Sequence, residues 1–141
     1  MIFRIGTKGA AMSAVVLSAA FLAGCATVGK PENPDEAAVK VRATARWEAL
    51  AKGDFQAAYQ FLPSSYRATS TLDDYRNRFG NAVVWLGAEP VSADCASERC
   101  MVMMNVEARM LTRGRAGHEF KSGVEETWIK EDGQWWYVMP R

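Results

Sequence analysis

Glu126 is the residue whose surroundings would give a carboxylate a chemical role in this 141-residue chain. It lies in an alternating stretch that places it on one face with the apolar Val124 and Trp128. If that face lines a cavity, desolvation raises the pKa of the carboxyl group, and Glu126 becomes a candidate acid, base or ligand-fixing group. Tyr59 and Tyr75 are then its candidate pocket partners. If the face is the outer one, Glu126 pairs in solvent with Lys130 or an arginine, and the residues alone leave both alternatives open.

The other residues that could do chemistry favour structural roles. His118 is the single histidine and follows a glycine-containing loop, which favours a solvated side chain. Asp73 and Asp74 fall in the first turn of an expected helix, where carboxylates favourably meet the positive end of the helix dipole. The sequence contains no P-loop, no G-x-S-x-G motif and no Cys/His cluster. We therefore predict no metal and no cofactor, and the catalytic residues, if there are any, stay unknown.

The N-terminal segment has the layout of an export signal. Arg4 and Lys8 precede an apolar stretch at residues 10–22, and no acid stands among them. A basic start, an apolar region of ~7–15 residues and small residues before a cleavage point are typical of a secretory signal. The stretch is too short to span a bilayer, which needs ~20 apolar residues.

This signal ends in Leu22-Ala23-Gly24-Cys25, which resembles the lipobox of bacterial lipoproteins. The resemblance implies cleavage before Cys25, diacylglycerol on its thiol and acylation of the new amine. Residues 1–24 would then be a lipoprotein signal peptide and residues 25–33 a lipidated tether. Ala26, rather than aspartate, follows the cysteine, which by the same resemblance implies the outer membrane, facing the periplasm. The alternative is an ordinary signal peptide that contains a cysteine.

The two remaining cysteines are Cys95 and Cys100. Export to an oxidising compartment favours a disulfide between an even pair. Their C-x-x-x-x-C spacing differs from the redox C-x-x-C motif, and no histidine cluster suggests zinc. We therefore expect a disulfide that staples the tip of a hairpin.

Charge excludes one class of partner. The chain carries 17 Lys and Arg against 16 Asp and Glu. Nucleic-acid binding needs a clustered basic face, so we expect no nucleic-acid partner. The same balance of charge argues against a polybasic membrane patch, so the lipid, rather than charge, would hold the protein on the membrane.

The order of elements predicts helices followed by strands. A helix over residues 34–52 begins with Asn33 as its cap and Pro34 in its first turn, and ends at Gly53. Two shorter helices follow, beginning at Asp54 and at Thr71. From residue 81 the apolar period changes to two, which predicts strands at 83–95, with a bulge near Pro90, and at 100–111, 118–131 and 134–139.

The Asp132-Gly133 pair predicts a two-residue hairpin, and its register decides which side chains share a face. Ile129, Trp136 and Val138 share one face, which we expect to pack on the helices. The other face carries the candidate interface residues, Trp128, Trp135 and Tyr137. Because such a face is too apolar for an idle surface, we expect it to contact a second copy of the chain or an envelope protein.

Two motifs then resemble the nuclear-transport-factor-2-like (cystatin-like, SnoaL-type) superfamily. They are RWEALAKGDFQAAY at residues 46–59 and ETWIKEDGQWW at residues 126–136. The resemblance implies an α+β domain over residues 34–141, with N-terminal helices packed on a curved, cone-like antiparallel sheet.

The superfamily contains both enzymes and binders, so the fold alone does not decide the function. Our expectation is a membrane-anchored envelope lipoprotein that presents a small non-catalytic binding domain. The alternative is a SnoaL-like enzyme of the isomerase or dehydratase type, acting on a small apolar substrate in the cone cavity. A convergent set of Glu126, Tyr59 and Tyr75 would distinguish the two.

Overall fold

Helices precede strands along the chain, as the sequence predicts. In the computed structural model, residues 33–112 and 115–140 are described, and Cys25 with the whole lipobox lies outside them. The helices are α1 (Pro34–Ala51), α2 (Phe55–Tyr59), α3 (Ser64–Arg67) and α4 (Leu72–Asn77). The strands are β1 (Val83–Ala96), β2 (Arg99–Thr112), β3 (Arg115–Glu131) and β4 (Gln134–Val138).

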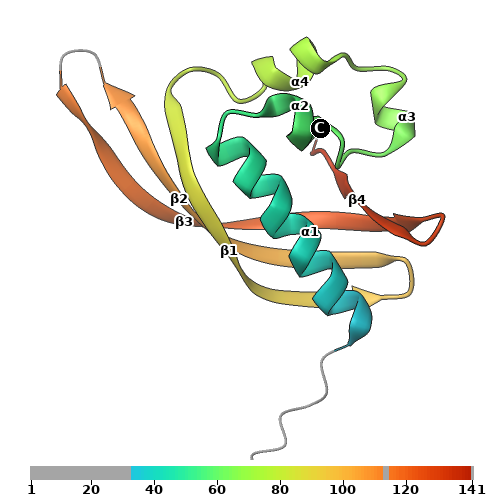
Figure 1. Ribbon diagram of the computed structural model, residues 1–141. Coiled ribbons are helices and arrows are strands. Elements are labelled where there is room, and N and C mark those ends of the chain that lie inside the picture. The colour runs from blue at the N-terminus through green and yellow to red at the C-terminus, as the bar shows by residue number, and fades with distance from the viewer. Residues whose placement is uncertain (1–32, 113–114, 141) are drawn as a thin grey trace, which may run out of the picture. The chain divides into compact units, whose positions relative to one another are not determined.

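The four strands form one antiparallel sheet in the order β1-β2-β3-β4, and α1 lies across one of its faces (Figure 1). The long strands β2 and β3 bend along their length (Figure 1). The chain is therefore an α+β protein with helices packed on an open antiparallel sheet. Within the described residues, no helix combines the length and the apolar character needed to cross a membrane.

The helix ends follow from local side-chain chemistry. The side chain of Asn33 accepts a hydrogen bond from the backbone N–H of Asp35 at 3.0 Å, which satisfies one orphan donor at the start of α1. Gly53 follows α1 with φ +71°, a conformation that costs glycine little. Asp54 caps α2, and Thr71 begins α4 with a capping box. These predicted starts are confirmed, whereas the one-turn helix α3 was not predicted.

The sheet register also agrees with the sequence. Lys130 pairs with Trp135, Ile129 with Trp136, and Trp128 with Tyr137. Asp132 and Gly133 both have positive φ, as the tight turn requires. Strand β1 has one irregularity between Trp85 and Gly87 and another between Pro90 and Ser92, which confirms the expected bulge near Pro90.

The core lies between α1 and the sheet face turned towards it, and this corrects our assignment of the faces. Trp128, Trp135 and Tyr137, which we expected to face outward, are buried in this core, so they do not form an exposed interface. Ile129, Trp136 and Val138, expected in the core, are only partly buried on the opposite face.

The physical reason is that the polar and aromatic contacts of α1 are made with this face of the sheet. Arg46 of α1 lies over the ring of Tyr137, and Arg46 and Trp47 both donate hydrogen bonds to Glu126, which shares this face with Trp128. The register was right, but it says only which side chains share a face, not which face is buried. The core also contains buried residues of α1, of β2 and of the helical segment that follows α1: Val39, Trp47, Leu50, Cys100, Val102, Met104, Val106, Ala58, Tyr59, Leu62 and Tyr75.

Candidate functional site: a buried carboxylate between helix and sheet

Glu126 lies on β3 in the core, with 1% of its surface exposed. Its Oε1 accepts hydrogen bonds from Nη1 of Arg46 at 2.6 Å and from Nε1 of Trp47 at 2.8 Å. Its Oε2 accepts from Nε1 of Trp128 at 3.0 Å. Both carboxylate oxygens are therefore held by donors of the protein itself.

The geometry of α1 and β3 brings these donors together. Arg46 and Trp47 are consecutive residues of α1, and both are buried where the helix meets the sheet. Trp128 stands two residues after Glu126 on the same strand, so both side chains point to the same side. A helix and a strand far apart in sequence thus meet at a single carboxylate.

Arg46 is the counter-ion, and it is as buried as its partner, with 2% exposed. Its guanidinium lies over the ring of Tyr137, 3.7 Å from the ring centroid. Stacking on an aromatic face suits the planar, weakly hydrated guanidinium. The positive charge therefore has a carboxylate on one side and an aromatic ring on another.

Burial dominates the titration of this cluster. It raises the pKa of Glu126, and the charge of Arg46 with the two indole hydrogen bonds opposes that rise. It also raises the pKa of Tyr75, against the charge of Arg46, and raises the pKa of Tyr137 to about 12. The two tyrosine hydroxyls are thus neutral at physiological pH.

The two tyrosines predicted to join Glu126 in a pocket make other contacts. The hydroxyl of Tyr59 donates to the backbone oxygen of Ser70 at 2.6 Å. The rings of Tyr59 and Tyr75 pack at 5.7 Å between centroids. The hydroxyl of Tyr75 is buried without a hydrogen-bond partner among the described residues. No hydrogen bond within this part of the chain joins either tyrosine to Glu126, so the three do not converge as a catalytic set.

The donors of Glu126 were not predicted, although the sequence carries a signal for one of them. Arg46 falls on the apolar side of α1, between the buried positions Ala43 and Leu50. An arginine on a buried helical face needs an acidic partner, because an unpaired buried charge is costly. Pairing that arginine with the one acid on an apolar strand face would have joined Arg46 to Glu126.

Surface hollows lie away from this carboxylate. One groove, of about 290 Å³, has walls that include Leu50, Phe55, Phe79, Trp85 and Leu111. Phe79 contacts both other aromatic rings, with centroids 5.5 Å from Phe55 and 6.4 Å from Trp85. Glu126 does not line this groove, so the apolar hollow and the carboxylate are separate features.

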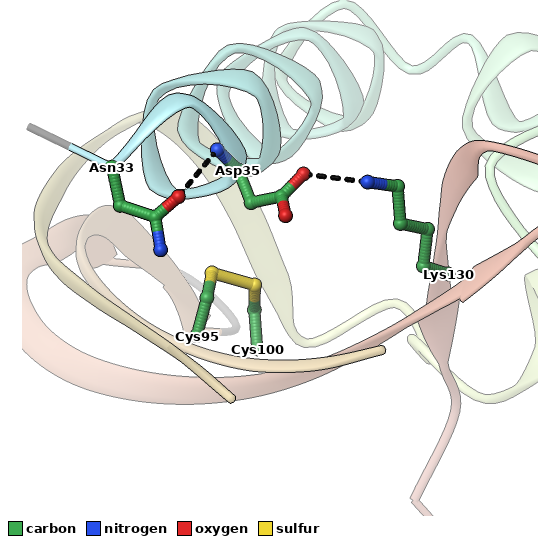
Figure 2. The surroundings of a disulfide bond; sticks show 5 residues. All are labelled: Asn33, Asp35, Cys95, Cys100 and Lys130. Atoms are coloured by element: carbon green, nitrogen blue, oxygen red, sulfur yellow. Dashed lines mark hydrogen bonds and ion pairs between the residues drawn. A yellow bond between two sulfur atoms is a disulfide. The ribbon is translucent and has the colours of Figure 1, made fainter. Parts of the chain in front are cut away.

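The expected disulfide is present between Cys95 and Cys100, across the β1–β2 hairpin. Figure 2 shows its surroundings, which include the capping residue Asn33 and an ion pair between Asp35 and Lys130. The Nζ of Lys130 lies 2.7 Å from Oδ1 of Asp35. The hairpin tip, the first turn of α1 and the end of β3 therefore meet in one place. Among the residues described, no group of three or more His, Cys, Asp or Glu side chains could hold a metal ion.

Comparisons with known proteins add information on the fold. No protein-family model and no curated protein matches this sequence. The solution structure of a SEC-C motif containing protein from Rhodopseudomonas palustris is similar, with a TM-score of 0.53 and 17% identity, over 67% of this chain and 70% of that chain. The association domain of C. elegans CaMKII has a TM-score of 0.48 and 21% identity, over 75% of this chain and 95% of that chain. The first likeness concerns the fold alone, and the second is too distant to support an inference.

Proposed function

We propose that this protein is a membrane-anchored envelope lipoprotein that presents a small, non-catalytic binding domain. The observation that carries this proposal is that both carboxylate oxygens of Glu126 already accept hydrogen bonds from the protein. Three donors occupy the carboxylate, and its surroundings are packed core. A general acid or base must reach the proton that it transfers, and this carboxylate is enclosed by its own protein.

The anchor rests on the sequence. The basic start, the short apolar stretch and the Leu22-Ala23-Gly24-Cys25 ending support lipidation of Cys25. Ala26 supports sorting to the outer membrane, with the domain facing the periplasm. The Cys95–Cys100 disulfide suits that oxidising compartment.

A nuclear-transport-factor-2-like, cone-like domain is the finer fold that we propose. Support comes from the two motifs that carry the resemblance, because each supplies a tryptophan that donates to Glu126. Trp47 comes from the first motif and Trp128 from the second. The residues that gave the resemblance are thus those that join the helix to the sheet.

The alternative, a SnoaL-like enzyme, gains no support from the geometry. Its candidate residues do not converge, and Tyr59 is bonded to Ser70 instead. A binding role agrees better with the aromatic groove of Phe55, Phe79 and Trp85, where Leu111 is 55% exposed. Apolar side chains gathered at a surface groove favour contact with a partner.

Acylation can be tested by labelling cells with a palmitate analogue and fractionating their membranes. The wild-type protein should carry the label and sediment with outer-membrane markers, whereas Cys25→Ser should be unlabelled. An Ala26→Asp variant is the matched control, since it keeps the lipid and should change only the membrane. Label that persists in Cys25→Ser would contradict the proposal.

The binding role can be tested with a photoreactive residue placed at Leu111. Glu119 is the matched control, because its side chain is similarly exposed, at 50%, but lies outside the groove. We expect one discrete crosslinked product in intact cells from Leu111 and none from Glu119. Equal products from both positions, or none from either, would count against a binding surface at the groove.

A further inference from the structure

A second apolar groove lies between α1 and β1. It has a volume of about 410 Å³ and is lined by Lys40, Val41, Thr44, Ala45, Glu48 and Pro90. Val41 is 70% exposed on the helix side, and Val91, beside Pro90 at the irregularity of β1, is 63% exposed. Valines this exposed are left without packing by the described part of the chain.

Desolvation of the floor of this groove should cost little free energy. Thr44 and Ala45 are small, so another helix backbone can approach closely. The hydroxyl of Thr44 donates to the backbone oxygen of Lys40 at 2.9 Å. Burying this threonine therefore leaves no donor without a partner.

The charges on this face of α1 are arranged symmetrically about Thr44. Lys40 stands one turn before it and Glu48 one turn after it, both on the side of the groove. A second α1 laid antiparallel across the first, with Thr44 against Thr44, brings each lysine level with the glutamate of the other copy. A parallel arrangement would instead place like charges together.

We propose that two copies of this chain associate through α1, antiparallel about Thr44, and that this contact buries Val41 of each copy in the groove. The occupant is a second copy because the face is complementary in charge to itself. This inference does not rest on the proposed function, since the face lies apart from the aromatic groove and from the Arg46–Glu126 pair.

The test uses the full-length protein in intact cells, with Thr44→Cys as a crosslinking site. Two cysteines at the symmetry axis should form a disulfide-linked dimer under mild oxidation. Glu119→Cys, an exposed position on β3, should form none. A crosslink from Thr44→Cys to a different protein, or the absence of a dimer, would overturn the proposal.

Charge reversal makes the test specific to this geometry. Lys40→Glu and Glu48→Lys should each weaken dimerisation by about tenfold. Because the dimer is symmetric, one substitution turns both Lys40–Glu48 pairs between the copies into repulsive pairs. The double variant restores opposite charges and should dimerise like the wild type. Dimerisation unchanged in both single variants would overturn the arrangement.

Mixing the two single variants removes the need for an introduced cysteine. Differently tagged Lys40→Glu and Glu48→Lys proteins should co-purify with each other more strongly than either does with itself. Circular dichroism of each variant checks that the fold is intact. Equal recovery of mixed and like pairs would contradict the proposal.

Discussion

The guanidinium of Arg46 and the carboxylate of Glu126 form a buried ion pair that joins α1 to β3, with 2.6 Å between Nη1 and Oε1. Taking two charges out of water is costly, and good geometry with further hydrogen bonds must offset that cost. Trp47 and Trp128 supply the further donors, so each carboxylate oxygen is satisfied. The pair therefore fixes how the helix lies on the sheet, and it makes the core intolerant of losing either partner.

Trp135→Ala should destabilise the protein far more than Trp136→Ala. Trp135 is 2% exposed in the core, and removing a buried tryptophan lowers the free energy of unfolding by ~3–5 kcal/mol. Trp136 is partly exposed and stacks with the guanidinium of Arg42, 5.4 Å from the ring centroid. Losing that contact should cost ~1 kcal/mol. Urea denaturation followed by circular dichroism measures both, and the reverse order would contradict the face assignment.

The Cys95–Cys100 disulfide should contribute little to stability. The mature protein isolated without reductant should have the intact mass of the disulfide form and no thiol open to alkylation. Because the closed loop is short, reduction should lower the free energy of unfolding by only ~1–2 kcal/mol. A Cys95→Ser/Cys100→Ser protein is the control that keeps the loop open. Two alkylatable thiols before reduction would show that the prediction is wrong.

Local features of the fold could be predicted because short-range chemistry determines them. Asn33 caps α1 through its own side chain, and Asp132-Gly133 sets the hairpin register through positive φ. The short helix α3 has too few residues to show a helical period, so the sequence pattern does not predict it. Helix existence and strand pairing are thus readable from neighbouring residues.

The site could be predicted only in part, because its contacts span the chain. Glu126 was identified from its own strand, but its partner Arg46 lies 80 positions away. The choice of faces failed because both faces of the last hairpin carry large apolar side chains. The contacts of Arg46 and Trp47 with Glu126 and Tyr137, which link α1 to β3 and β4, distinguish the buried face from the other one.

Alkaline pH should destabilise the protein through Tyr137. Burial raises the pKa of this hydroxyl from 10.0 to about 12 in the folded state. Below pH 10, both the folded and the unfolded chain keep the proton, and stability is at its full value. Between these two pH values the unfolded chain loses the proton first, so the free energy of unfolding falls as pH rises.

Denaturation at a series of pH values, together with tyrosinate absorbance, tests this dependence. The alkaline loss of stability should be smaller in Tyr137→Phe than in the wild type. Tyr66→Phe is the control at a partly exposed position. If Tyr137→Phe shows the same alkaline loss as the wild type, Tyr137 is not the group responsible.

A double-mutant cycle on Arg46 and Glu126 tests most directly whether this carboxylate serves the fold rather than a reaction. Arg46→Met and Glu126→Leu should each lower the free energy of unfolding by ~3–5 kcal/mol, because each leaves a buried charge without its partner. The double variant should recover part of that loss, because no charge is left unpaired, although the indole N–H groups of Trp47 and Trp128 still lack their acceptor. The exposed pair Arg109–Glu119 is the matched control, and breaking it should cost ~1 kcal/mol or less.

Urea denaturation gives the free energies of unfolding of the wild type, the two single variants and the double variant. The account predicts a large coupling energy between Arg46 and Glu126. A Glu126→Leu protein as stable as the wild type, or more stable, would contradict it, since that is the behaviour of a strained catalytic residue.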